Sequence, residues 1–137
     1  MPTTIRAVEY YFTTVKDQPG EGYRLLSALA AGEVNLLAFH AIPVGYGSIQ
    51  LFLYPESPER LLQTAEKAGL VLHGPQPALL IHGDDRLGSL VGFHEKLASE
   101  KINVVSSSGV TDGRGGYGYV IHVCPGDRER AARALGC

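Results

Sequence analysis

A pattern of turn, helix start and strand occurs twice in this sequence. The first copy begins at Asp17-Gln18-Pro19-Gly20 and the second at Asp85-Arg86-Leu87-Gly88, an offset of 68 residues in the numbering (17 to 85). At the same offset, Val34-Asn35-Leu36-Leu37 corresponds to Ile102-Asn103-Val104-Val105. Repeated blocks in the same order indicate that the chain contains two copies of one folding unit.

A third pair of blocks extends the repeat. Tyr46-Gly47-Ser48-Ile49 resembles Tyr117-Gly118-Tyr119-Val120 when two or three extra residues are allowed in the preceding loop. A chain of 137 residues has room for two very small domains. We therefore expect one domain over residues 1–74 and a second over residues 75–137.

The first copy reads as strand, helix, two strands, helix and a short strand. Asp17 is placed to accept from amides of the first helical turn, and Ser57-Pro58-Glu59 is typical of a helix start. The expected strands are Ile5–Val15, Val34–Ile42, Ser48–Tyr54 and Leu70–His73, and the expected helices run from about Pro19 to Ala31 and from Ser57 to Gly69.

The second copy repeats this order but ends early. Its expected strands are Ala78–His82, Ile102–Val110 and Tyr117–Cys124, with a helix stripe of Leu87, Leu90, Val91, His94, Leu97 and Ala98 and a last helix at Asp127–Leu135. Each copy thus predicts an α+β, ferredoxin-like βαββαβ unit, an antiparallel sheet with helices on one face. The second copy lacks its last strand, so we expect sheets to pair and cover the unpaired edge.

Composition excludes several classes of function. The net charge of −2 offers no basic excess for a nucleic acid, and no apolar run approaches the ~20 residues of a membrane span. The first residues lack the pattern of a signal peptide, and two cysteines, Cys124 and Cys137, make no disulfide framework. These observations favour a cytoplasmic protein.

The repeated motif resembles the ACT domain family. In that family a D-x-P-G turn opens the first helix, as in Asp17-Gln18-Pro19-Gly20, and an Asn between apolar residues begins the second strand, as in Val34-Asn35-Leu36. The resemblance covers the whole chain as a stand-alone tandem pair. It implies a regulatory module that binds an amino acid or similar metabolite between domains that pair side by side.

The resemblance also implies which residues bind. In the first copy these are Asp17, Gln18, Pro19, Gly20 and Asn35, and in the second Asp85, Leu87, Gly88 and Asn103. Amides at a helix start attract a carboxylate, a carboxylate accepts from an ammonium group, and an Asn side chain does both, which suits a zwitterion. The alternative is that Asp17 only caps the helix and Asn35 only bonds a loop. The second copy departs from the motif, because Leu87 replaces the proline.

Other patterns point to no enzyme, metal or cofactor. The five histidines lie on different elements, and only His82 with Asp84 and Asp85 forms a local group of metal-ligand types. The glycine-rich run from Gly113 to Gly118 precedes a strand, which favours a hairpin over a phosphate loop, although Arg114 on it could reach a ligand carboxylate.

The leading hypothesis is a non-catalytic regulatory module that binds an amino acid at the turn and domain interface. It would be a homodimer, it would need no cofactor, and it could regulate a partner enzyme. The alternative is a structural or protein-interaction module that dimerises through its sheets and binds no small ligand.

Overall fold

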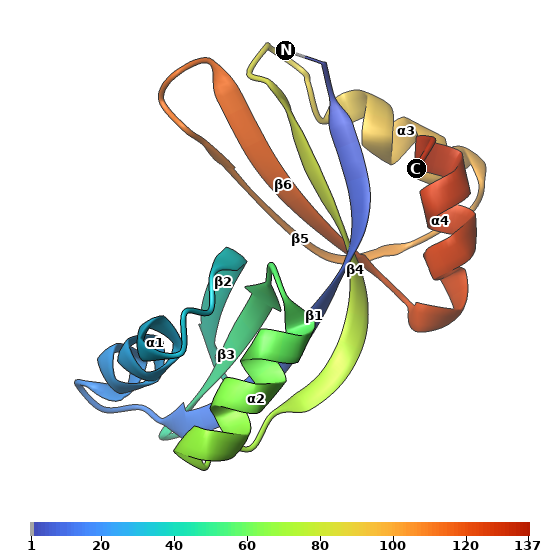
Figure 1. The fold of residues 1–137 in the computed structure, drawn as a ribbon. Helices are drawn as coiled ribbons and strands as arrows, with labels where there is room; N and C mark the ends of the chain where they lie inside the picture. Colours follow the sequence, from blue (N-terminus) through green and yellow to red (C-terminus); the bar gives the residue numbers. More distant parts are fainter. Residues whose placement is uncertain (1) are drawn as a thin grey trace. The chain divides into compact units, whose positions relative to one another are not determined.

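The computed structural model describes residues 2–137 and shows six strands and four α-helices in alternation (Figure 1). The elements in chain order are β1 (Thr4–Lys16), α1 (Glu21–Ala31), β2 (Leu36–Pro43), β3 (Ser48–Pro55), α2 (Pro58–Ala68), β4 (His73–Asp84), α3 (Val91–Ser99), β5 (Val104–Thr111), β6 (Gly116–Val123), a 3-10 turn at Pro125–Asp127 and α4 (Arg128–Leu135).

The chain divides into two compact units that exchange strands. The N-terminal unit is Glu9–Gln76, and the C-terminal unit is Pro77–Cys137 together with the preceding N-terminal residues up to Val8. The strands are hydrogen-bonded in the order β2-β3-β1-β4-β6-β5. The boundaries between the units fall within β1, after Val8, and within β4, after Gln76, so each of these strands contributes one part to each unit. No strand follows α4, as predicted, and the start of β1 takes the fourth strand position of the C-terminal unit.

The N-terminal unit has its core on the helix side of its sheet. Tyr11 of β1 and Leu53 of β3 pair in register and pack with Leu25 and Leu29 of α1 and Leu61 of α2. Alternate residues point to the other face because side chains alternate along a strand. There an aromatic network is formed by Tyr10, Phe12, Phe52, Tyr54, His40 and His73.

The C-terminal unit is built in the same way. Leu79 and Ile81 of β4, Ile121 of β6, Leu97 of α3 and Leu135 of α4 form its buried core. Ile5 of β1 packs against this cluster as a partly buried side chain. The start of β1 is therefore part of the hydrophobic core of a unit whose other residues begin at Pro77.

Backbone hydrogen bonds confirm the repeat in detail. After α1, the Val34 amide donates to the Leu29 carbonyl at 2.9 Å, and after α3 the Ile102 amide donates to the Leu97 carbonyl at the same distance. Glu33 and Lys101, at equivalent positions, both have a positive φ, 58° and 57°. Two non-glycine residues in this uncommon conformation at matched positions show that the copies share one helix ending.

Local helix signals were read correctly where they are strong. Ser57 is the N-cap of α2, its hydroxyl oxygen accepts from the Arg60 amide at 3.3 Å, and Pro58 is the first helical residue. Gly69 ends this helix with φ of 71°, the left-handed conformation that glycine adopts at little cost.

Three expected boundaries were wrong. The strand expected at Leu70–His73 does not form on its own: only His73 is in a strand, and it belongs with Ala78–His82 to β4, because the Gly74–Pro77 segment stays extended instead of turning. Helix α1 begins at Glu21, since Gly20 has a φ of 94° that ends the preceding turn. Helix α3 begins at Val91, so Leu87 does not belong to its buried stripe and is fully exposed.

None of the helices described for residues 2–137 has both the length and the apolar character needed to cross a membrane.

Candidate functional site

The two turns predicted to bind a ligand occupy equivalent places in the two units. The Asp17 amide donates to the Gly47 carbonyl at 2.9 Å, and the Asp85 amide donates to the Gly115 carbonyl at 2.8 Å. In each unit this bond ties the turn before a helix to the hairpin between the next two strands. The position of each turn is thus fixed by the sheet and not only by its own sequence.

The β4–α3 turn of the C-terminal unit is held closed by one side chain. The Ser89 hydroxyl oxygen accepts a hydrogen bond from the Arg86 amide at 2.9 Å. The same hydroxyl group can donate to the Asp84 carbonyl, at 3.0 Å, or to the Arg86 carbonyl, at 2.7 Å. The Ser89 amide also donates to the Arg86 carbonyl at 3.0 Å. Gly88, with φ of 77°, lets the chain reverse inside this ring of bonds.

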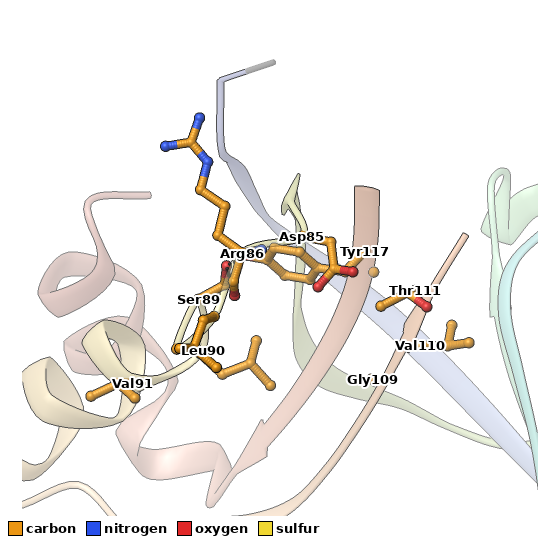
Figure 2. Close-up of a pocket in the computed structure, with 12 residues that line it drawn as sticks. Asp85, Arg86, Ser89, Leu90, Val91, Gly109, Val110, Thr111 and Tyr117 are labelled. Atoms are coloured by element: carbon orange, nitrogen blue, oxygen red, sulfur yellow. Dashed lines mark hydrogen bonds between the residues drawn. The ribbon is translucent and has the colours of Figure 1, made fainter. Parts of the chain in front are cut away.

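A cavity of about 690 Å³ lies beside this turn. Three of the residues predicted for the second site, Asp85, Leu87 and Gly88, line it. Figure 2 shows the turn facing the end of β5, with Leu90 projecting between them. The rest of the lining is Arg86, Ser89, Leu90, Val91, Gly109, Val110, Thr111, Tyr117 and Gly118. Its volume is within the range of small-molecule sites.

Charge at this cavity is unevenly distributed. Arg86 extends away from the other lining side chains in Figure 2, and its guanidinium forms an exposed ion pair with Asp84 at 3.6 Å. Asp85 is exposed. Burial raises the pKa of Tyr117, and the nearby Asp84 carboxylate raises it further, so this phenol is neutral at physiological pH. The cavity therefore offers the Asp85 carboxylate and neutral hydroxyl groups, those of Tyr117 and Thr111.

The corresponding turn of the N-terminal unit is more open. Asp17, Gln18, Pro19 and Gly20 are all exposed. The expectation that Asp17 caps α1 was wrong, because Gly20 is the N-cap and no side chain accepts from the first turn. Instead, the Gln18 amide side chain donates to Glu21 at 2.7 Å, and Arg24 pairs with the same carboxylate at 3.3 Å.

Neither predicted asparagine lies next to its turn. Asn35 precedes Leu36, which pairs with Pro55, whereas Lys16, just before the first turn, pairs with Ser48 at the other end of β3. Seven residues of strand separate the two ends, roughly 23 Å. Asn35 instead donates to the Glu56 carboxylate at 3.0 Å. Asn103 lies at the corresponding end of β5, because Val104 pairs with Val123 and Asp84 with Gly116.

Other candidates from the sequence have structural roles. Asp112 accepts from the amides of Arg114 and Gly116 at 2.6 and 3.0 Å, and these bonds hold the pKa of its carboxyl below the ordinary value. Arg114 lines a separate cavity of about 330 Å³ with His82, on the hairpin side of Tyr117. Among residues 2–137, no group of three or more His, Cys, Asp or Glu side chains is arranged to hold a metal ion.

Sequence reasoning missed the apolar half of the site. Leu90 and Val91 were assigned to the buried helix stripe, and Tyr117 and Gly109 were seen only as strand residues. The predicted match of Tyr46-Gly47-Ser48-Ile49 to Tyr117-Gly118-Tyr119-Val120 was wrong. Lys16 pairs with Ser48 and Asp84 with Gly116, so Ile49 and not Tyr46 is the equivalent of Tyr117. Which strand face meets the turn depends on register, and the sequence did not determine this register.

Comparisons with known proteins give the fold a context. No protein-family model matches this chain, and no curated protein does so. Among solved structures, a protein from Bacteroides thetaiotaomicron is similar with a TM-score of 0.81 and 13% identity, over 96% of this chain and 88% of that one.

Two further similar structures have a named role. The regulatory subunit of aspartate kinase from Thermus thermophilus, in its ligand-free form, gives a TM-score of 0.66 at 16% identity over 97% of this chain and 93% of that one. The corresponding subunit from Thermus flavus gives 0.60 at 15% identity over 98% and 95%. The chain therefore has the fold of these regulatory subunits, and the tandem, ferredoxin-like α+β arrangement that the sequence predicted is confirmed.

Proposed function

We propose that this protein is a non-catalytic regulatory module that binds an amino acid at the β4–α3 turn of the C-terminal unit. The observation that carries the proposal is the cavity of about 690 Å³ beside a turn to which the sequence resemblance assigns ligand binding. The similarity to regulatory subunits of aspartate kinase supports it by analogy of fold alone.

The groups at the turn suit a zwitterion. Within residues 2–137, the amides of Leu87 and Gly88 donate to no protein acceptor, so they are free to receive a carboxylate just before α3. The helix dipole favours a negative charge at this place. Asp85, on the same cavity, can accept from the ligand's ammonium group.

The equivalent turn at Asp17–Gly20 in the N-terminal unit is proposed as a further binding site because the two copies are equivalent. The backbone hydrogen bond from this turn to its hairpin matches the bond from Asp85 to Gly115. Asn35 and Asn103 lie at the far end of the sheet from the turns and are left out of the proposed sites.

We also propose a homodimer in which a partner unit closes each pocket. Exposed apolar side chains recur at matched positions of the two copies: Tyr23 on α1 corresponds to Val91 on α3, and Ile42 on β2 to Val110 on β5. Strands β2 and β5 are the two ends of the strand order. Unpaired edges with apolar neighbours favour pairing with another chain. A ligand held there would stabilise one packing of domains over another, and this could control a partner enzyme.

A thermal-shift panel of the twenty amino acids tests the binding function. Ligand at a hundredfold excess over its dissociation constant adds about 2.7 kcal/mol to the free energy of unfolding, a shift of several degrees. Asp85→Asn should reduce the shift, and Asp17→Asn reports on the other turn. Glu129→Gln, an exposed change on α4, is the control. No shift with any amino acid would refute the proposal.

The second candidate is an interaction module without a small ligand. The matched exposed apolar positions favour it as much as they favour the homodimer. It predicts no thermal shift with any amino acid, together with a stable protein complex. Sedimentation of the purified protein distinguishes self-association from a requirement for another protein.

A further inference from the structure

We infer that the cavity at the β4–α3 turn selects amino acids with an apolar side chain. This inference rests on the proposed function and names the class of ligand. The free amides of Leu87 and Gly88 and the carboxylate of Asp85 all belong to the turn. The remainder of the lining must therefore meet the ligand's side chain.

The part of the lining that faces the ligand's side chain is apolar. Leu90 and Val91, at the start of α3, and Tyr117, which is buried, contribute apolar surface to the lining. Gly109 of β5 and Gly118 of β6 contribute only backbone to it. A side chain of several carbon atoms placed here would replace contacts with water by contacts with Leu90 and Val91.

The distribution of charge opposes a charged side chain on the ligand. A lysine or arginine ligand would need a second carboxylate, and Asp85 is the only acidic residue in the lining among residues 2–137. An aspartate or glutamate ligand would need a cation, but Arg86 extends away from the cavity and pairs with Asp84. Thr111 and Tyr117 supply hydroxyl groups at the strand side. Ser89 cannot help a polar ligand, because its hydroxyl already closes the turn.

Pairs of ligands with the same shape give a direct test. Leucine and asparagine differ in side-chain polarity but have nearly the same outline, and so do valine and threonine. Their ammonium and carboxylate groups are identical, so the turn binds both members of a pair alike. Calorimetric titration of the full-length protein should give leucine and valine dissociation constants on the order of 10- to 100-fold lower than those of asparagine and threonine.

A matched pair of variants tests where the selection arises. Val91→Asn places an amide in the cavity wall, and Val105→Asn makes the same change at an exposed valine of β5 that does not line the cavity. Both positions are exposed, 64% and 58%, so neither change threatens the core. Val91→Asn should reduce the preference for leucine over asparagine at least fivefold, and Val105→Asn should leave it unchanged.

Each outcome decides between the possibilities. Preference for apolar ligands that Val91→Asn removes supports the inference. Equal or tighter binding of asparagine, threonine or a charged amino acid overturns the inference while the proposed function stands. Preference for leucine that Val91→Asn leaves intact also overturns it, because the selection then arises elsewhere. Failure of every amino acid to bind overturns the inference together with the proposed function.

Discussion

The amide of Asp85 donates to the carbonyl of Gly115 at 2.8 Å, and this bond joins the candidate binding turn to the hairpin between β5 and β6. The equivalent bond from Asp17 to Gly47 shows that the arrangement belongs to the repeat. A ligand at the turn would therefore act on the hairpin as well, and through it on the outermost strand, β5. Ligand binding would thereby affect β5, the edge strand at which we propose that a second chain pairs.

Replacing Ser89 with alanine should loosen the β4–α3 turn. The Ser89 hydroxyl group makes the bonds that close the turn, and each is worth about 1 kcal/mol in the free energy of unfolding. We expect a loss of about 1–2 kcal/mol in urea unfolding and weaker amino-acid binding. Ser99→Ala is the control, because Ser99 makes only an exposed bond back to the Glu95 carbonyl. Equal effects of the two changes would show that the turn does not depend on Ser89.

Replacing Gly109 with alanine should destabilise the C-terminal unit. An added Cβ would lie 2.8 Å from Cδ1 of Tyr119, which is buried and has its hydroxyl 2.7 Å from His94 Nε2, so the ring cannot easily move. Overpacking of this kind costs about 1–3 kcal/mol. Gly92→Ala, in α3 with nothing within 4 Å, should instead be neutral or stabilising by up to ~1 kcal/mol. Chemical denaturation of both variants checks the sign as well as the size.

Shortening Ile5 to alanine should weaken the C-terminal unit more than the N-terminal one. Ile5 precedes the boundary at Val8 and packs against the core of β4, β6, α3 and α4. Amide exchange followed by mass spectrometry should show faster exchange in β6 and α4 than in β3 and α2. Arg6→Ala is the control, since Arg6 is exposed on the same strand. Faster exchange confined to the N-terminal unit would contradict the strand exchange.

Acid should loosen the hairpin between β5 and β6. The pKa of Asp112 is lowered in the folded protein by hydrogen bonds from the Arg114 and Gly116 amides. The stabilisation is therefore fully present above the unfolded pKa of about 3.9 and is lost as the pH falls through the lower folded value. Nuclear magnetic resonance should show the Arg114 and Gly116 amides moving together below about pH 4.

The matched control for this titration is Asp112→Asn. The asparagine side chain still has an oxygen that can accept from the two amides, but it does not titrate. The movement of the Arg114 and Gly116 amide resonances in acid should disappear in this variant. If it persists, another group controls the hairpin.

The sequence predicted best those features that depend on residues close together in the chain. Ser57, Pro58 and Gly69 act within a few residues of themselves, and their roles in starting and ending α2 were read correctly. The repeat was also found, because it needs only a comparison of the chain with itself. The ferredoxin-like unit followed from the order of elements in each copy, and the ACT resemblance from the Asp17-Gln18-Pro19-Gly20 turn and Val34-Asn35-Leu36.

Several of the errors involve contacts between distant segments. Asn35 follows the turn closely in sequence, yet register places it at the other end of the sheet, where it bonds Glu56. The Gly74–Pro77 segment resembles a linker, yet it lies within β4 and is held extended. The place of Ile5 in the second core depends on pairing across some seventy residues, which no local pattern reveals.

The exchange of strands sets an order of events during synthesis. The residues up to Val8 leave the ribosome before any of Pro77–Cys137, the remainder of the unit that they complete. At typical rates of translation, about 5–20 residues per second, the first segment waits several seconds for its partners. During that wait the strand start carries an unpaired edge, and the C-terminal unit becomes stable after the N-terminal one. A chaperone that holds extended segments would find its substrate in the residues up to Val8.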